Sequence, residues 1–149
     1  MIEQLYKKDL YIKQFEKLTV KANAAPWLLE KHYISESITL GWVLRNRDLV
    51  INEIIRTLKE HKYHTPLALE KEVIVDDKKR LLYHFDWHEK ILQGVMADVL
   101  TSFFEPLFSD SLYSYRRGRG PYDTLTKLSK FIKSIDDDKT IFVIKKDIV

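Results

Sequence analysis

Apolar residues recur at helical spacing over the first sixty residues and predict a helical amino-terminal region. Six apolar positions place an amphipathic helix in the first twenty residues: Ile2, Leu5, Tyr6, Leu10, Phe15 and Leu18. The stretch 23–26 ends this helix, because the residue before a proline avoids helical dihedral angles. Residues 27–42 predict one or two short helices. Asn46 is a candidate cap for a further helix with this apolar face: Leu49, Val50, Ile54, Ile55 and Leu58.

A β-hairpin and a long helix are predicted next. Residues 67–75 and 80–85 have the β-prone composition of two strands, and the polar residues 76–79 predict the turn between them. Asp86 is a plausible cap for the helix that follows. Apolar pairs four residues apart predict one broad stripe on that helix: Ile91/Leu92, Val95/Met96, Val99/Leu100, Phe103/Phe104 and Leu107/Phe108.

The last forty residues predict a loop, a helix and a strand. Residues 109–120 contain two glycines and read as a loop, and Pro121 suits the first turn of a helix. Residues 136–139 predict a turn, and residues 140–144 predict a β-strand that leads to Asp147. We therefore expect a helix-dominant α+β (mixed α/β) fold, with a helical region at 1–66 and a second region at 67–149.

Composition and charge narrow the class of protein. Hydrophobic residues make up 45% and charged residues 32% of the 149 positions, which is typical of a folded globular chain. No cysteine is present, so disulfides and thiolate metal sites are excluded. The amino terminus does not resemble a signal peptide and no apolar run has membrane-spanning length, so we expect a cytoplasmic protein without a membrane partner. The net charge of +3 is small, but residues 113–133 hold six Lys or Arg and one acid.

Three segments carry candidate chemistry. The hairpin residues Lys78, Lys79 and Arg80 could bind a triphosphate, although charged turns are also common on ordinary surfaces. The basic loop around residues 113–122 combines arginines, glycines and tyrosines just before a helix. This composition suits a nucleic-acid-binding surface, and it equally suits a basic loop that is packed by its own tyrosines. Asp147 ends an apolar strand, where a carboxylate can bind Mg²⁺ or simply form a turn. The five histidines favour structural or surface roles over a zinc site.

The order of five short blocks resembles the opening of group II intron-like and other bacterial reverse transcriptases. The matching blocks are Arg80-Leu81-Leu82, 88–93 (HEKILQ), 104–108 (FEPLF), 112–120 (LYSYRRGRG) and Lys146-Asp147-Ile148. The resemblance implies the fingers and first palm strand of a right-hand polymerase, which catalyses nucleotidyl transfer with Mg²⁺. It also implies an RNA template, a DNA or protein primer and a deoxynucleoside triphosphate as partners.

The resemblance assigns roles to individual residues. Arg80, assisted by Lys78 or Lys79, would contact the incoming triphosphate. Four residues of the basic loop would line the template and nucleotide channel: Tyr115, Arg116, Arg117 and Arg119. Asp147 would be the first catalytic aspartate and a metal ligand.

Several departures qualify the resemblance. Leu81 stands where the family has proline, and residues 83–85 (YHF) replace its usual "G-I-P". These changes favour a divergent lineage such as the abortive-infection and phage-defence enzymes. The chain ends before the paired-aspartate turn of the family, so we expect no polymerase activity from this chain alone, and some self-association through uncovered apolar surface. Two alternatives remain open at this point: a non-catalytic nucleic-acid-binding module, and a helical protein-interaction domain that uses the stripe at 91–108.

Overall fold

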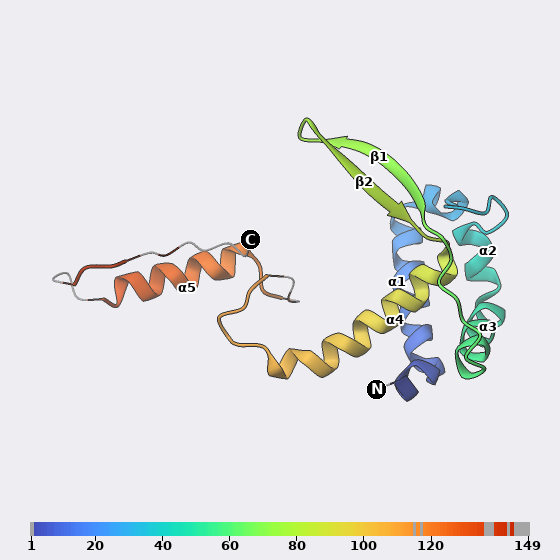
Figure 1. The fold of residues 1–149 in the computed structure, drawn as a ribbon, viewed down its shortest axis with the longest axis horizontal. Coiled ribbons are helices and arrows are strands. Elements are labelled where there is room, and N and C mark those ends of the chain that lie inside the picture. The colour runs from blue at the N-terminus through green and yellow to red at the C-terminus, as the bar shows by residue number, and fades with distance from the viewer. Residues whose placement is uncertain (1, 115, 117, 136–138, 143, 145–149) are drawn as a thin grey trace. The chain divides into compact units, whose positions relative to one another are not determined.

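The computed structural model describes residues 2–114, 116, 118–135, 139–142 and 144, and it divides the chain into two compact units, Met1–Phe103 and Phe104–Val149. Figure 1 shows the elements. Those that begin in the first unit are η1 (Ile2–Tyr6), α1 (Lys8–Ala24), η2 (Pro26–Glu30), α2 (Leu40–Arg45), α3 (Arg47–Lys59), β1 (Leu69–Val75), β2 (Lys78–His84) and α4 (Trp87–Phe104); the second unit holds η3 (Glu105–Leu107) and α5 (Pro121–Lys133). The division differs from the predicted one after residue 66, because the first half of α4 completes the core of the amino-terminal helices.

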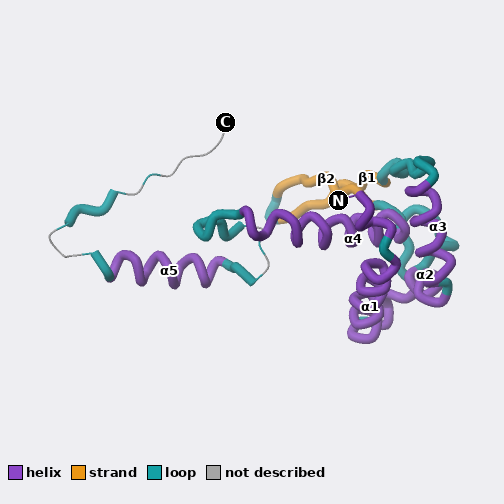
Figure 2. The backbone as a smooth tube through the Cα atoms, turned by 90° about the horizontal axis from the view of Figure 1, so that it is seen from below, coloured by secondary structure: helices purple, strands orange, loops and turns teal. Residues whose placement is uncertain are grey.

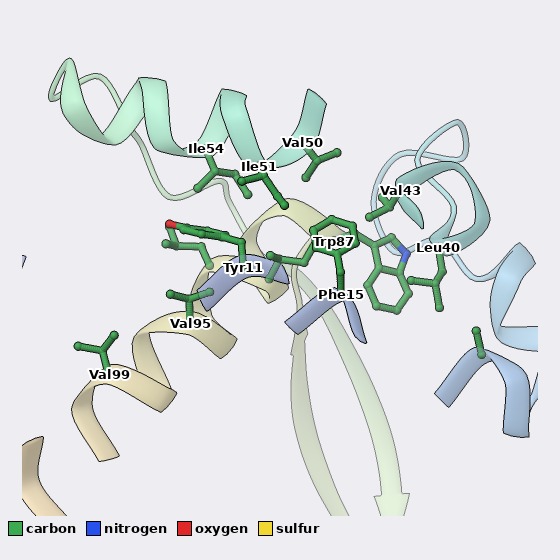
Figure 3. Packing of buried hydrophobic residues seen from close by; sticks show 13 residues of the cluster. Tyr11, Phe15, Leu40, Val43, Val50, Ile51, Ile54, Trp87, Val95 and Val99 are labelled. Atoms are coloured by element: carbon green, nitrogen blue, oxygen red, sulfur yellow. The ribbon is translucent and has the colours of Figure 1, made fainter. Parts of the chain in front are cut away.

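The core of the first unit forms where aromatic side chains of α1 and α4 meet aliphatic side chains of α2 and α3 (Figure 3). Trp87 opens α4, is 5% exposed, and donates its indole N–H to the carbonyl oxygen of Lys31 at 2.8 Å. Tyr11 is fully buried and donates its hydroxyl to the carbonyl of Leu5 at 2.8 Å. Burial raises the pKa of the Tyr11 hydroxyl to about 12. Each polar atom that enters this core therefore has a partner.

A glycine gives the Gln14 side chain of α1 access to the backbone of α4. The side-chain amide of Gln14 donates to the carbonyl of Gly94 at 3.0 Å and to the carboxylate of Asp98 at 2.6 Å, and Lys17 also binds that carboxylate at 2.6 Å. A Cβ atom on residue 94 would lie 2.8 Å from the Gln14 side-chain oxygen. The absence of a side chain at Gly94 is therefore what lets Gln14 reach the backbone of α4.

The hairpin forms a two-stranded antiparallel sheet in which Val75 pairs with Lys78 and Leu69 with His84 (Figures 1 and 2). Its turn consists of Asp76 and Asp77 alone, both with positive φ (52° and 60°). Two consecutive residues of this kind make a type I′ turn, whose twist matches that of the strands. The predicted turn at 76–79 was therefore too long, because Lys78 and Lys79 already belong to β2.

Two residues that were predicted as helix caps lie at the expected positions, but their side chains form hydrogen bonds with other segments of the chain. Asn46 is the N-cap residue of α3, yet its side chain donates to the carbonyl of Trp42 at 2.8 Å instead of capping α3. The carbonyl of Asp86 accepts the first hydrogen bond of α4, from the Lys90 N–H. Its carboxylate instead accepts the backbone N–H groups of Ile34 and Ser35 at 3.0 and 3.2 Å. Asp86 therefore ties the loop before α2 to the start of α4.

The predicted apolar stripe of the long helix is buried over only part of its length. Ile91, Leu92, Val95 and Val99 are buried, whereas Met96 and Leu100 are 40% and 39% exposed. The α-helix ends at Phe104, before Pro106 in η3.

The first helix and the helix that starts at Pro121 are confirmed, but the strand predicted at 140–144 is not. Residues 140–142 and 144 have no strand assignment. A strand requires a neighbour for its backbone hydrogen bonds, and β1 and β2 pair only with each other within the described chain. Helices dominate the fold and the one small sheet is antiparallel, which confirms the general α+β class.

None of the described helices combines the length and the apolar character that are needed to cross a membrane.

Candidate nucleic-acid interface

The hairpin separates its charges between two faces. Successive side chains of a strand point to opposite faces, so the pairing register places Lys71, Lys78 and Arg80 on one face. Lys79 lies on the other face, where its ammonium pairs with the Glu72 carboxylate at 3.0 Å. No ion pair joins Lys71, Lys78 or Arg80 to any residue that the structure describes, and all three are exposed. We call these three residues the cationic face of the hairpin.

This arrangement resolves which lysine accompanies Arg80. The sequence left Lys78 and Lys79 as equal candidates, and the register brings Lys78, not Lys79, to the side of Arg80. Lys71 was not predicted. The alternation of side chains within β1 can be read from the sequence, but only the pairing register shows that Lys71 shares a face with Lys78 and Arg80.

The block 88–93 that follows the hairpin is structural. Glu89 is 4% exposed and accepts hydrogen bonds from the Tyr63 hydroxyl and, at 2.9 Å, from the side-chain amide of Gln93. Burial, together with the Glu89 carboxylate, raises the pKa of the Tyr63 hydroxyl. Lys90 lies 4.1 Å from the centre of the Tyr33 ring, and burial lowers its pKa. Glu89 and Lys90 thus anchor the start of α4 to Tyr63 and Tyr33, and Gln93 supports the Glu89 carboxylate from within the helix.

In the second unit, Arg116 organises the loop between η3 and α5. Its side chain is only 5% exposed, and its guanidinium donates to the Glu105 carboxylate (3.0 and 2.6 Å) and to the carbonyls of Ser109 and Leu112 (2.8 and 3.1 Å). The same group lies 5.6 Å from the centre of the Phe108 ring. The guanidinium is therefore committed to the loop itself, and the prediction that Arg116 contacts nucleic acid gains no support from this geometry.

The ion pair of Arg116 should be detectable as a shifted titration. The hydrogen bond from Arg116 holds the pKa of the Glu105 carboxyl below its usual 4.5, so this contact contributes stability above pH 4.5 and is lost as the pH falls through the lowered pKa. In a carbon NMR titration of the Glu105 carboxyl, we expect Arg116→Gln to return the pKa toward 4.5. An unchanged pKa in the variant would show that the ion pair is absent in solution.

Arg119 is held less tightly than Arg116. Its guanidinium donates to the carbonyl and the carboxylate of Asp110 at 2.8 and 3.0 Å, and it lies 5.7 Å from the centre of the Tyr113 ring. The Arg119 side chain is 26% exposed and that of Asp110 is 88% exposed, so solvent reaches this ion pair freely. Hydrogen bonding and charge from Arg119 lower the pKa of the Asp110 carboxyl.

Three of the predicted site residues, Tyr115, Arg117 and Asp147, lie outside the described residues. Among the side chains that the structure does describe, no group of three His, Asp or Glu could hold a metal ion. The structure therefore places the cationic face in the first unit and Arg116 and Arg119 in the second, and the residues that it describes contain no metal site to which Mg²⁺ could be assigned.

No protein-family model and no curated protein matches the sequence.

Proposed function

We propose that the chain forms the fingers of an RNA-directed DNA polymerase of the bacterial reverse transcriptase type. In this proposal the cationic face binds the phosphates of the template, primer or incoming nucleotide. Asp147 would supply a ligand for Mg²⁺, which would stabilise the attacking and leaving oxygens of nucleotidyl transfer. The proposal rests on the order of the five blocks in the sequence and, above all, on the charge separation within the hairpin.

The charge separation carries the proposal because it distinguishes a binding surface from an ordinary charged turn. In an ordinary turn the cations lie among acids, as Lys79 does beside Glu72. Lys78 and Arg80 instead share a face with Lys71, and none of the strand residues on that face is acidic; the acids Asp76 and Asp77 lie in the turn. Two residues along a strand span about 7 Å, so these cations form a row that an extended phosphodiester chain can follow. Arg80 can bind phosphate oxygens with its two-pronged guanidinium, and Lys78 adds a point charge.

A binding titration tests the proposal directly. We expect the double variant Lys78→Gln/Arg80→Gln to weaken binding of a fluorescently labelled RNA–DNA template–primer about tenfold or more. Each lost phosphate contact removes the counterion release that drives association. The dependence of log K on log salt, measured by fluorescence anisotropy, should become shallower by roughly one for each cation removed.

Lys79→Gln is the matched control for the single variants Lys78→Gln and Arg80→Gln, because it removes one positive charge from the same hairpin but from the opposite face. Its affinity and salt dependence should stay close to those of the unmodified chain. Equal weakening by Lys78→Gln, Lys79→Gln and Arg80→Gln would indicate a diffuse charge effect and would contradict a site on the cationic face.

A second candidate function is protein–protein interaction through helices, and one observation favours it. Helix α5 contains no buried residue, although its apolar side chains cluster on one side: Leu125, Leu128, Phe131 and Ile132. This alternative predicts self-association and little nucleic-acid affinity. The same titration, combined with sedimentation at increasing protein concentration, separates the two functions.

A further inference from the structure

The first unit contains a pocket of about 540 Å³ that is bordered by α2, α3, the segment after α3 and the start of α4. Pockets of roughly 300–1,000 Å³ suit small organic ligands. Apolar side chains, including that of Trp42, form part of the lining. Acids outnumber the one lysine among its ionisable residues, which are Glu53, Asp86, Glu89, His64, His88 and Lys62.

The acids of this pocket lack the cationic partners that other acids of the chain have. Elsewhere in the first unit, for example, Asp98 binds the Lys17 ammonium at 2.6 Å. No lysine or arginine that the structure describes forms an ion pair with Glu53, Asp86 or Glu89; the one charged contact of the three joins Glu53 Oε2 to a histidine nitrogen at 4.0 Å. The Asp86 carboxylate accepts backbone N–H groups instead.

Glu89 makes this imbalance costly. Its side chain lies in a residue that is only 4% exposed, and its described hydrogen bonds come from neutral groups, a tyrosine hydroxyl and a side-chain amide. Glutamate is rarely buried without a cationic partner, because neither water nor an opposite charge then offsets the lost hydration. A ligand that brings a positive charge into the pocket would supply this missing partner.

Lys62 does not fill that role. Its ammonium pairs with the carboxylate of Glu60, outside the lining, at 3.1 Å, and its side chain is 73% exposed. With both histidines neutral, three acids and one lysine leave a net charge of −2 on the lining, although the whole chain has a net charge of +3. The pocket is therefore a local negative site on a positive protein.

We propose that this pocket binds a ligand that carries a guanidinium group on an apolar stem. A guanidinium is planar, stacks on aromatic faces and offers five N–H donors, so it can bridge carboxylates on α3 and α4. Trp42 and His88 both border the pocket, with ring centres 6.4 Å apart, and the indole face attracts cations. A bare metal ion fits less well, because within the described residues no three His, Asp or Glu could hold one. The inference goes beyond the polymerase proposal and does not depend on it.

The test uses butylguanidinium as the probe and butylurea, its neutral counterpart of similar shape, as the control ligand. Binding to the full chain is followed through the indole N–H signal of Trp42 in two-dimensional NMR spectra. We expect butylguanidinium to shift this signal in a saturable manner and butylurea to leave it in place. The signals of Trp27 and Trp87, which do not border the pocket, should stay unchanged. Equal shifts with both ligands, or no saturable shift, would overturn the proposal.

Variants locate the charge that the ligand recognises. Glu53→Gln should weaken binding of butylguanidinium about two- to fivefold, the factor that corresponds to one exposed ion pair. Asp48→Asn is the matched control, because it removes one negative charge from an exposed position of the same helix outside the pocket. Its affinity should stay close to that of the unmodified chain, and equal weakening by the two variants would contradict a site in this pocket.

Glu89→Gln tests the buried charge. It keeps an oxygen that can accept the tyrosine hydroxyl, and we expect it to weaken binding about tenfold, because a hydrogen bond to a buried charge contributes more than an exposed one. Urea denaturation shows whether this variant is folded. If it is not, Glu53→Gln decides the question, since the Glu53 side chain is 52% exposed and its loss leaves the core intact.

A capped tripeptide with a central arginine distinguishes the source of the guanidinium. If it shifts the Trp42 signal at concentrations similar to those of butylguanidinium, the pocket accepts the arginine side chain of a partner protein. If only butylguanidinium binds, the pocket accepts a free small molecule. Both results support the site, whereas failure of both probes overturns it. That failure would leave the polymerase proposal untouched, because the variants of Lys78 and Arg80 test that proposal separately.

Discussion

Replacing Trp87 with alanine is expected to lower the free energy of unfolding of the first unit by about 3–5 kcal/mol, the usual cost of removing a large buried aromatic side chain. Trp87 is 5% exposed and packs edge-on against Tyr33 with ring centres 5.1 Å apart. The substitution also removes the donor to the Lys31 carbonyl. Because most small domains are stable by only about 5–15 kcal/mol, a loss of this size should be evident in urea denaturation followed by far-ultraviolet circular dichroism.

Trp27 provides the matched control for this prediction. It is 67% exposed and its ring contributes one cation–π contact, with the Lys31 ammonium at 5.8 Å. Trp27→Ala should therefore change the free energy of unfolding by no more than about 1 kcal/mol. Comparable losses in the two variants would mean that the core does not form around Trp87.

The second prediction concerns Gly94. Alanine at this position would normally stabilise a helix by about 1 kcal/mol relative to glycine. Here the new Cβ would meet the Gln14 side chain at 2.8 Å and force it away from the Gly94 carbonyl and from Asp98. Losing two hydrogen bonds, one of them to a charged group, costs roughly 2–4 kcal/mol, so the loss exceeds the helical gain. We expect Gly94→Ala to destabilise the first unit by about 1–3 kcal/mol in the same urea experiment.

The Gln14→Ala background reverses the sign of this effect. With the Gln14 amide removed, the added methyl group meets no obstacle, and Gly94→Ala should stabilise the chain by up to about 1 kcal/mol. The difference between the two backgrounds measures the coupling between α1 and α4. Additive effects would contradict the contact between Gln14 and Gly94.

Local sequence patterns predicted the elements better than they predicted the contacts. The period of the apolar residues and the helix-starting Pro121 located α1, α3, the first half of α4 and α5. The contact between Gln14 and Gly94 joins residues eighty positions apart, and no local pattern indicates it. The strand at 140–144 was predicted from its apolar composition alone, whereas a strand also depends on a partner that composition does not specify.

The candidate site shows the same division between local and distant information. The sequence predicted Arg116 and Arg119 as nucleic-acid-binding residues, but nothing local distinguishes their surroundings. The structure gives Arg116 a nearly closed setting against Glu105 and gives Arg119 an open one beside Asp110. Lys78 and Lys79 are adjacent and chemically identical, and only the pairing of β1 with β2 assigns them to opposite faces.

The alternation of the hairpin also determines which kinds of genetic change it can accept. Substitution at one position affects one face and leaves the other intact. A single inserted or deleted residue within β2 would rotate every side chain between that point and the turn onto the opposite face. Lys79 would then exchange sides with Lys78, and the row of cations would be interrupted. Among functional descendants of this chain, the hairpin should therefore tolerate substitution outside the cationic face, while its strand lengths, counted from the Asp76-Asp77 turn, stay constant or change by two.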